Sequence, residues 1–510
     1  MANKSLFASA IAKLLPATDS VNREFAPAYA YGPQARLAQL AATGTLSDSF
    51  YASAETIEAA KAADSLFVAK AAIYAREAGT MKDMPALLCA YLTLADPDLA
   101  VVVFGRVIDT GRMLRTFVQI MRSGQVGRTS LGTRPKRLVQ TWLETASMRD
   151  LMAAATGNDP SLADIVRMVR PNPATDERRA FYGWLIGKPY DVAALPVEIA
   201  AFVAWKRDPS GVLPPVPFEW LTAFPLSAEQ WGELARSMGW QALRMNLNTL
   251  ARNGAFGVAG VADAVAARLS DSAAIGKARV LPYQLMVALG SAGDGVPLKV
   301  QAALETALEA SVATVPSVAG RVIICPDVSG SMASPATGFR KGATSKVSCN
   351  DVAALVAAAM LRTNRQARVL PFEQKVVGIA LDPYARLAVN TAKLAAVCGG
   401  GTNVSAPLAK LNAERAAIDL VVIVSDNQSW VDAVQGGATQ TMREWDRIVR
   451  RNPAAKLVCI DIQPHGTMQA SGRAEILNVG GFSDAVFDTI AKFARGETRD
   501  WVGTIEQTEV

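Results

Sequence analysis

The hydrophobic pattern of the chain changes near residue 318, and this change limits the possible fold more than any other feature. Residues 50–310 carry apolar side chains at helical spacing almost throughout, and hardly any stretch alternates as a strand does. After residue 318, short apolar runs typical of buried strands alternate with helical segments. This second pattern predicts a parallel sheet covered by helices on both faces. The proline-punctuated segment 313–320 is the expected junction.

A chain of 510 residues is too long for one ordinary hydrophobic core. We expect an N-terminal segment over residues 1–49, an all-α helical-repeat domain over 50–318 and a doubly wound α/β domain over 319–510. Helical spacing in the middle part is visible over residues 52–76, 85–94, 113–122, 162–169, 229–236 and 261–269. Consecutive helices of this kind predict an α-solenoid. An irregular helical bundle is the alternative, and periodicity alone does not choose between them.

In the last part of the chain, three apolar runs have the length and composition of buried strands. They are RVIIC at 321–325, LVVIV at 420–424 and KLVCIDI at 456–462. The helical runs that alternate with them lie at 351–363, 385–397, 439–451 and 483–495. Strands and helices in this order predict a doubly wound sheet.

The composition restricts the available chemistry. The apolar runs are short and the N-terminal stretch lacks a clear cleavage site, so we expect no membrane span, no signal peptide and a cytoplasmic location. Five cysteines without a CxxC pair argue against a disulfide framework and a structural zinc site. They are Cys89, Cys325, Cys349, Cys398 and Cys459. The single histidine, His465, excludes an HExxH metal site and leaves any Ser-His-Asp triad dependent on that one residue.

The positive charge is unevenly distributed. The whole chain has 52 basic and 46 acidic residues, a formal excess of six. Residues 101–143 alone hold eight basic side chains against one acidic residue, Asp109. The eight are Arg106, Arg112, Arg115, Arg122, Arg128, Arg134, Lys136 and Arg137. Such a block is typical of a polyanion site, and a solvated helix face is the alternative interpretation.

Oxygen-bearing side chains follow two of the expected strands. Asp327, Ser329 and Ser331 come directly after the strand at 321–325, and Asp426 follows the strand at 420–424. Thr402 lies in the Gly-Gly-Thr loop between them. Ligands of open α/β sheets bind at the carboxyl ends of the strands, so these residues are expected at one edge. Carboxylates and hydroxyls are hard donors that suit magnesium, and the sequence therefore predicts a Mg²⁺ site.

This arrangement resembles the metal-ion-dependent adhesion site of von Willebrand A domains. The resemblance implies the ligand set Asp327, Ser329, Ser331, Thr402 and Asp426, with one coordination position open to an acidic group of a partner. The loop 332–350, which holds Arg340, Lys341 and Lys346, separates the motif from its helix. It is either a mobile lid or a surface insertion, and we favour the insertion.

The helical half also carries a resemblance. Five segments are similar to the TROVE domain of Ro ribonucleoproteins: residues 73–88, 127–142, 166–173, 243–256 and 277–289. The pieces GGTNVSAPL, VSDNQSW and GFSDAVFDTIAKFARGE of the last part are similar to the Ro family as well. The resemblance is collinear over residues 50–496 and points to a bacterial-type member.

What the Ro resemblance implies is a ring of HEAT-like helical repeats closed by the A domain, acting as a monomer. It implies binding of single-stranded 3′ ends of misfolded or noncoding RNA, and of a structured Y-like RNA on an outer basic surface. It also implies a 3′ exoribonuclease as a partner. The residues expected to contact RNA are Arg76, Lys82, Arg128, Lys136, Arg137, Arg170 and Lys277.

One departure concerns the outer RNA surface. The family has basic residues on the helix before residues 166–173 and a histidine where this chain has Arg170. Here that helix, expected over 151–161, holds no positive charge, so the outer surface is expected to be depleted. The function that follows is a non-catalytic RNA-binding protein. The rival hypotheses are a metal-dependent protein-interaction scaffold and a structural ring that has lost its RNA role.

Overall fold

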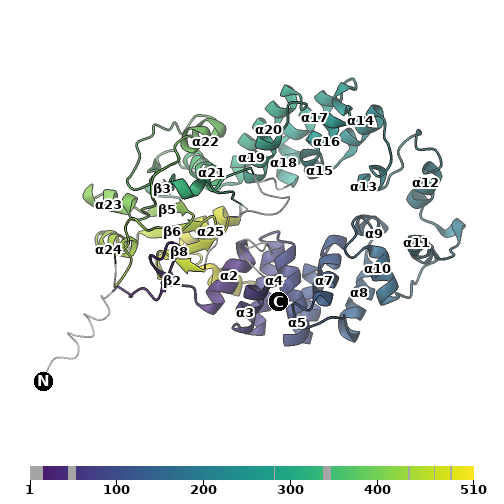
Figure 1. Ribbon diagram of the computed structural model, residues 1–510, viewed down its shortest axis with the longest axis horizontal. Coiled ribbons are helices and arrows are strands. Elements are labelled where there is room, and N and C mark those ends of the chain that lie inside the picture. The colour runs from purple at the N-terminus through teal and green to yellow at the C-terminus, as the bar shows by residue number, and fades with distance from the viewer. Residues whose placement is uncertain are drawn as a thin grey trace. The chain divides into compact units, whose positions relative to one another are not determined.

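The computed structural model describes residues 15–43, 53–278, 280, 282–336, 346–434, 437–463, 466–482 and 485–510. Its contacts divide the chain into two units (Figure 1). The first, here called the α/β unit, comprises Met1–Ala52, Leu281–Gly290 and Leu308–Gln507. The second, the helical unit, comprises Ser53–Val280, Ser291–Ala307 and Thr508–Val510. Among the described helices, none is both long and apolar enough to cross a membrane.

The α/β unit is built on a five-stranded parallel sheet in the order β4-β3-β5-β6-β8. Its strands are β3 (Val322–Pro326), β4 (Arg368–Val369), β5 (Leu420–Ser425), β6 (Lys456–Asp461) and β8 (Ile476–Gly480). The central strands are buried along their whole length, which is why they read as continuous apolar runs rather than alternating ones.

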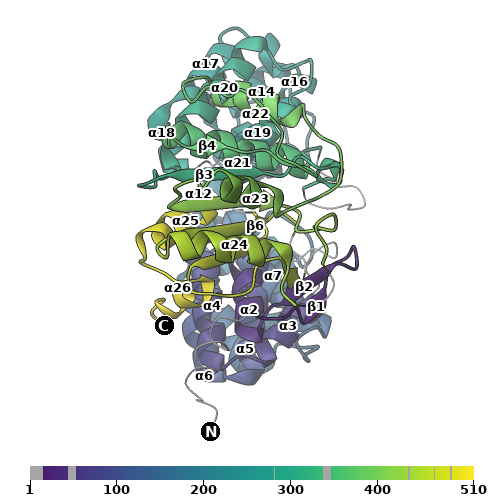
Figure 2. The same ribbon diagram turned by 90° about the vertical axis from the view of Figure 1, so that its left-hand side faces the viewer.

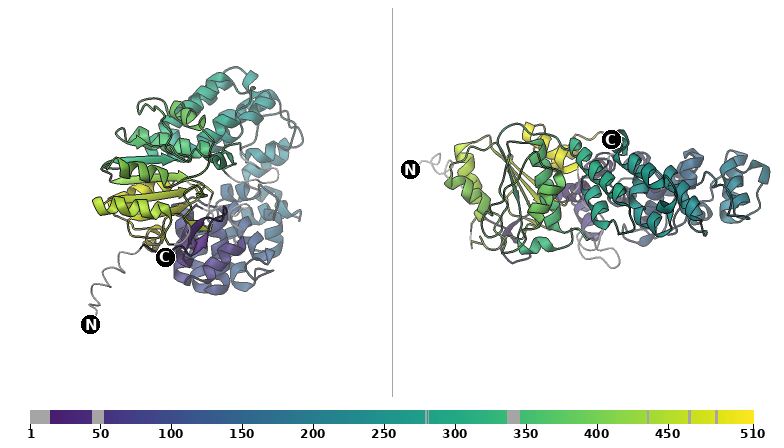
Figure 3. Two further views of the ribbon diagram at one scale, coloured as in Figure 1. Left: turned by 60° about the vertical axis from the view of Figure 1, so that its left-hand side comes forward. Right: turned by 90° about the horizontal axis from the view of Figure 1, so that it is seen from above.

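Helices cover both faces of this sheet. They are α21 (Cys349–Thr363), α22 (Leu387–Ala395), α23 (Ala406–Ala413), α24 (Gln440–Arg451) and α25 (Ala485–Arg495). Side chains of α23 and α24 share one core cluster with alternate residues of the strands, and α21 packs on β3 and β5. Figure 2 shows α23 and α24 in front of the sheet, and the right panel of Figure 3 shows the sheet edge-on between helices.

The N-terminal segment belongs to the α/β unit. Strand β1 (Ser20–Val21) pairs with β2 (Pro27–Ala30), and β2 pairs with β7 (Thr467–Met468) in a small antiparallel sheet. The side chain of Gln39, on helix α2 (Pro33–Thr43), bonds to backbone groups at both Asn478 and Gly480 of β8. From the sequence, we expected residues 1–49 to form a segment separate from the two domains. The strand pairing and these bonds instead join residues 15–43 to the sheet.

The helical unit consists of short helices that follow one another in chain order (Figure 1). Those of its first half are α3 (Ser53–Lys61), α4 (Ser65–Glu77), α5 (Asp83–Ala95), α6 (Pro97–Val107), α7 (Gly111–Ser123), α8 (Thr133–Thr145), α9 (Met148–Ala154), α10 (Leu162–Val169) and α11 (Asp176–Ile186). Then come α12 (Val197–Trp205), α13 (Phe218–Leu221), α14 (Ala228–Ser237), α15 (Trp240–Met245), α16 (Leu247–Arg252), α17 (Val261–Ser270) and α18 (Ser272–Ala278).

Two further helices, α19 (Pro282–Ser291) and α20 (Leu298–Ser311), lie near the boundary of the units, and α26 (Trp501–Glu506) follows α25. Helices of the helical unit pack on their near neighbours in the chain, as in α4 on α5 and α5 on α6. This is the pattern of helical repeats, in which each unit contacts its neighbours. The predicted fold class, helical repeats followed by a doubly wound α/β domain, is confirmed.

Capping residues explain where several of these helices begin. Asp64 and Asp96 accept hydrogen bonds from backbone N–H groups in the first turns of α4 and α6, and Pro97 starts α6. Ser161 and Asp164 form a reciprocal capping box at α10. The start of each helix is therefore specified locally, while its packing face is set by its apolar side chains.

Candidate metal centre and basic surface

The five predicted metal-binding residues lie at the carboxyl end of the parallel sheet. Asp327 directly follows β3, and Asp426 directly follows β5. The two strands are adjacent and parallel, so both carboxylates reach the same edge. Ser329 and Ser331 lie in the turn after β3, and Thr402 lies in the loop before α23. The structure therefore brings together residues up to 99 positions apart in the sequence.

The three hydroxyl groups form a tight cluster beside the carboxylates. The Thr402 hydroxyl donates a hydrogen bond of 2.9 Å to Ser329 Oγ. Ser331 Oγ lies 3.2 Å from Ser329 Oγ and 3.4 Å from Thr402 Oγ1. Ser331 is also hydrogen-bonded to the carboxyl group of Asp426, which on its own lowers the pKa of that group. One cluster thus holds hydroxyl and carboxylate oxygens from three separate loops.

Backbone contacts hold these loops in place. The Asp327 N–H donates to Val424 O at 2.8 Å, and the Gly330 N–H donates to Gly400 O at 3.1 Å. Gly400 has a φ of +76°, and a Cβ at this position would stand 1.8 Å from Glu373 Oε2. Glycine is therefore required at Gly400 both by backbone conformation and by space.

The carboxyl group of Asp327 is fully buried. One of its oxygens accepts the backbone N–H of Ser329 at 2.8 Å, and the other accepts the Ser425 hydroxyl at 2.7 Å. Burial, together with the nearby charge of Asp426, nevertheless raises the pKa of Asp327 to about 7. Burial also raises the pKa of Asp426. Two buried carboxyl groups that oppose each other's ionisation favour a cation between them.

A third buried carboxyl group, Asp461, was not among the predicted site residues. It ends strand β6 next to β5, and burial followed by the charge of Asp426 holds its pKa well above the usual range. In the sequence, Asp461 could have been noticed as the acidic residue within the apolar run KLVCIDI. Within the described residues, no three acidic, cysteine or histidine side chains are grouped closely enough to share a metal. Asp461 therefore does not join Asp327 and Asp426 in a group of three acidic side chains that could share one ion.

The donor set fits a hard divalent cation. Mg²⁺ takes about six oxygen ligands and usually keeps several waters, so a few carboxylates and hydroxyls are sufficient. Here two buried carboxyl groups and three clustered hydroxyls are available. The residues that would hold the ion are Asp327, Ser329, Ser331, Thr402 and Asp426. A bound ion would supply positive charge that offsets the repulsion between the carboxylates.

Parts of the sequence prediction fall outside the described residues. Arg340 and Lys341 of the loop 332–350 lie outside the described residues, and so does His465. The described ends of the loop meet at an antiparallel bridge between Pro335 and Ser348, and Lys346 is exposed. The five cysteines all carry free thiols, four of them buried and Cys398 exposed.

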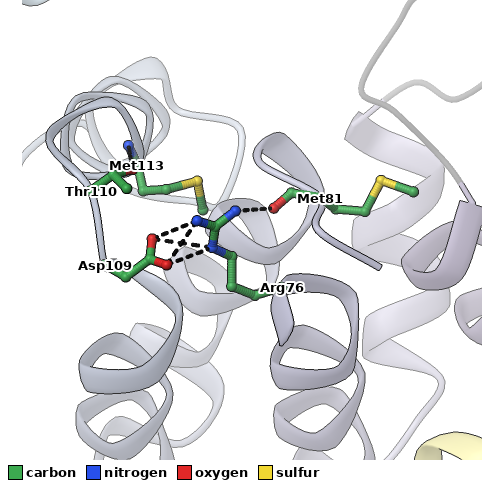
Figure 4. Close-up of polar contacts among 5 residues, drawn as sticks. All are labelled: Arg76, Met81, Asp109, Thr110 and Met113. Carbon is green, nitrogen blue, oxygen red and sulfur yellow. Dashed lines mark hydrogen bonds and ion pairs between the residues drawn. The ribbon is translucent and has the colours of Figure 1, made fainter. Parts of the chain in front are cut away.

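Arg76, the first predicted RNA contact, already has protein partners. Its guanidinium bonds to both carboxylate oxygens of Asp109 at 2.7 to 3.1 Å and to Met81 O at 3.1 Å (Figure 4). The Arg76 side chain is 15% exposed. These bonds join the end of α4 to the connection between α6 and α7, so the geometry favours a structural role. Contact of Arg76 with RNA stays a prediction.

Lys82, unlike Arg76, lies near other positive charges. It precedes α5 and its side chain is exposed, and its pKa is lowered first by partial desolvation and then by the charges of Arg112 and Arg76. Arg112 is exposed in the first turn of α7 and has no ion-pair partner among the described residues. Burial and the charge of Arg112 also lower the pKa of Arg115. Arg112 thus lies close enough to both Lys82 and Arg115 for its charge to disfavour theirs, and the three residues are here called the cation cluster. Arg112 and Arg115 belong to the basic block, which we interpret as a polyanion site, but they were not among the seven residues singled out as RNA contacts.

The remaining predicted RNA contacts are spread over the helical unit. Arg128 donates to Thr93 O at 2.9 Å, which ties its guanidinium to the end of α5. Lys136 and Arg137 lie on α8, the former half-buried and the latter exposed. Arg170 ends α10 in a left-handed conformation with a φ of +50°, and Lys277 is exposed on α18. Contact of each with RNA stays a prediction.

Residues 151–161, which hold no positive charge of their own, lie next to a positively charged side chain from another helix. Helix α9 ends at Ala154 instead of continuing to residue 161, because Gly157 and Pro160 interrupt it. A Cβ at Gly157 would stand 1.8 Å from an Arg115 guanidinium nitrogen. The Arg115 side chain of α7 therefore lies against this loop, and the absence of positive charge in residues 151–161 does not leave the surface neutral.

The two units define a class of protein: a helical-repeat region combined with a doubly wound domain of the von Willebrand A type. The family model described as the Ro60 vWA domain matches residues 321–494. The chain is 26% identical over 511 residues to the RNA-binding protein RO60 of Deinococcus radiodurans, covering 92% of this chain and 94% of that one.

A solved structure agrees with this comparison. The crystal structure of the Deinococcus radiodurans Ro (Rsr) protein matches the fold with a TM-score of 0.65 and 23% identity, covering 92% of this chain and 100% of that chain. The family model and the relative support the expected resemblance to bacterial-type Ro proteins, and the solved structure supports the same fold.

Proposed function

We propose that this chain is a non-catalytic RNA-binding protein that takes the single-stranded 3′ ends of misfolded or noncoding RNA. The cation cluster is the observation that carries the proposal. The charge of Arg112 contributes to lowering the pKa of both Lys82 and Arg115, and none of the three has an ion-pair partner among the described residues. The relative from Deinococcus radiodurans that is named an RNA-binding protein supports the same reading.

The position of the cluster favours an anion. Lys82 stands at the N-terminus of α5 and Arg112 in the first turn of α7, where the helix dipole disfavours positive side chains. A phosphate group at this place would interact favourably with the cations and with the backbone N–H groups of both helix ends. Phosphate contacts are largely independent of sequence, which suits a protein that handles many defective RNAs. Delivery of such RNA to a 3′ exoribonuclease, by a monomeric protein, belongs to the same proposal.

A gel-shift titration against salt tests the role of the cluster. The double variant Lys82→Gln/Arg112→Gln should bind a single-stranded RNA at least about 10-fold more weakly than wild type, because two phosphate contacts are lost. The slope of log affinity against log salt should fall by about 1 to 2. Arg499→Gln, which removes an exposed cation of the α/β unit, is the matched control and should leave both quantities unchanged. An unchanged affinity and slope in the double variant would contradict the proposal.

We also propose that the candidate metal centre binds Mg²⁺. The rival function, a metal-dependent interaction scaffold with incidental RNA binding, shares this site and is separated from the proposal by the same titration. In the scaffold, RNA affinity would be weak and would not depend on Lys82 and Arg112. In the RNA-binding protein, RNA affinity would depend on them and would be independent of Asp327.

A further inference from the structure

A pocket lies beside β8, the edge strand of the five-stranded parallel sheet. Its volume is about 390 Å³, and residues of α2, β7, β8 and α26 line it, all within the α/β unit. None of the described residues that line it belongs to the candidate metal centre or to the cation cluster. Sites for small organic molecules span about 300 to 1,000 Å³, so this pocket is large enough for a molecule of one or two rings.

Strand β8 does not offer this pocket to an extended peptide. The Gln39 side chain of α2 bonds to the backbone oxygen of Asn478 and to the backbone nitrogen of Gly480. An added peptide strand would need these same backbone groups, because strand addition depends on main-chain hydrogen bonds along a sheet edge. The occupant that fits the pocket is therefore a small molecule rather than a further strand.

Apolar side chains form much of the pocket walls. Trp501 is 1% exposed, Ile476 is 2% exposed and Met468 is 8% exposed, and Tyr31 adds a second aromatic side chain. A ring system placed against these walls would remove apolar surface of both partners from water, and contacts between aromatic rings add to this gain. The walls therefore favour a ligand with a flat, largely apolar ring.

One polar atom of the pocket residues is left without a hydrogen bond. Asn478, on β8, is 8% exposed, and its Nδ2 donates to Ala470 O at 3.1 Å. This bond assigns the nitrogen end of the amide and leaves Oδ1 at the other end. Oδ1 is buried and has no hydrogen-bond partner among the described residues. Because an unpaired buried acceptor is unfavourable, a ligand N–H group that donates to Asn478 Oδ1 would be bound favourably.

The pocket also carries one positive charge without an ion-pair partner. Arg499 lines the pocket, is exposed and has no ion-pair partner among the described residues, whereas Arg473 pairs with Glu475 at 2.5 Å. Asp500, next to Arg499, accepts the backbone N–H of Gly503 at 2.7 Å and adds a negative charge. A phosphate group carries nearly two negative charges, so these charges suit a single carboxylate better.

We propose that this pocket binds a small heteroaromatic carboxylate, that is, a flat ring with an N–H donor and one acid group. The ring packs on the apolar walls, the N–H group donates to Asn478 Oδ1, and the carboxylate pairs with Arg499. This inference goes beyond the proposed RNA binding and the proposed Mg²⁺ site, and it uses the residues of neither.

Isothermal titration calorimetry of the full-length chain with three such compounds tests the pocket. Indoleacetate, pyrrolecarboxylate and orotate each carry a ring N–H and one carboxylate. Indoleacetate should bind the most tightly, because its two fused rings bury the most apolar area. N-methylindoleacetate lacks the donor and should bind at least about 10-fold more weakly than indoleacetate. Indoleacetamide lacks the charge and should bind about 3-fold more weakly.

Two variants assign these differences to residues of the pocket. Asn478→Leu removes the acceptor at similar side-chain volume, so it should bind indoleacetate at least about 10-fold more weakly and no longer distinguish it from N-methylindoleacetate. Arg499→Gln changes an exposed side chain and should fold as wild type, but it should no longer distinguish indoleacetate from indoleacetamide.

Asn412→Leu is the matched control for Asn478→Leu. Asn412 belongs to the same unit and also has a buried Oδ1 without a hydrogen-bond partner among the described residues, but it does not line this pocket. It should bind indoleacetate as wild type does.

Four outcomes would overturn the proposal. Binding by none of the three compounds would leave a pocket that holds solvent alone. Equal affinities of wild type for indoleacetate and N-methylindoleacetate would show that Asn478 Oδ1 accepts no ligand N–H. Affinities unchanged in both Asn478→Leu and Arg499→Gln would place the compound elsewhere. Tighter binding of adenosine monophosphate than of indoleacetate would make the ligand a nucleotide. Failure of the RNA-binding function would be seen separately, in the Lys82→Gln/Arg112→Gln titration.

Discussion

The Ser425 hydroxyl donates a 2.7 Å hydrogen bond to Asp327 Oδ2, joining the ends of two adjacent strands that are 98 residues apart in the chain. The same Ser425 oxygen accepts the backbone N–H of Asn427 at 3.1 Å. This pair orients a buried carboxylate toward the hydroxyl cluster of Ser329, Ser331 and Thr402. Ser425 thus acts as a positioning residue for the candidate metal centre, and it was not among the predicted site residues.

Replacement of Asp327 by asparagine should separate charge from shape at this centre. Because the buried carboxyl groups of Asp327 and Asp426 oppose each other's ionisation, Asp327→Asn should leave the metal-free protein as stable as wild type or more so. Wild type should gain about 2.7 kcal/mol at a Mg²⁺ concentration 100 times the Kd, and the variant should gain none. Thermal unfolding with and without Mg²⁺ measures both quantities. An equal gain in the two proteins would place the ion elsewhere.

The Arg76–Asp109 pair should contribute to stability more than to RNA binding. Arg76→Gln and Asp109→Asn should each lower the free energy of unfolding by about 1 kcal/mol, and the double variant should be little worse than either single one. Such non-additivity is expected because each change already breaks the bidentate contact. Urea unfolding of the four proteins gives the coupling energy. If Arg76→Gln instead weakened RNA binding as strongly as Lys82→Gln at unchanged stability, Arg76 would be an RNA contact.

A single-stranded 3′ tail should raise RNA affinity. An extended strand fits a narrow basic site, whereas an A-form duplex is about twice as wide and is recognised by its backbone and shape. We expect a structured RNA with a 3′ tail to bind more tightly than the same RNA with a blunt end. Competition between the two in gel shifts at one fixed salt concentration measures the difference. Equal affinities would favour binding by surface charge alone.

Acid should weaken the ion pair between Arg321 and Asp419 at the start of β3. Asp419 accepts hydrogen bonds from the backbone N–H and guanidinium of Arg321 at 2.8 to 2.9 Å, which hold its pKa at about 2, below its ordinary value of 3.8. A pKa that is lowered in the folded state stabilises the protein above pH 4, and this contribution is lost as the pH falls from about 4 to about 2. Acid titrations of wild type and Asp419→Asn should therefore converge over this range. A constant difference between their stabilities from pH 6 to pH 2 would contradict the assignment.

Local patterns in the sequence were sufficient for the fold class and for the candidate metal centre. Strands β3, β5 and β6 are recognisable because a strand buried on both faces is apolar along most of its length. Asp327 and Asp426 could be placed together because parallel strands end at a common edge, a rule that holds without knowledge of side-chain contacts.

Only the tertiary structure decided which charges are neutralised and which surfaces are exposed. Arg76 meets Asp109 33 residues away, Arg115 reaches the loop at Gly157, and Asn22 donates a hydrogen bond to Ser429 O 407 positions later. The N-terminal hairpin likewise joined the α/β unit through β7. Helical and strand periods follow from the backbone geometry of a few consecutive residues, so they are visible in the sequence. The partner of a charged or aromatic side chain depends on how distant segments pack, and that is set by the whole fold.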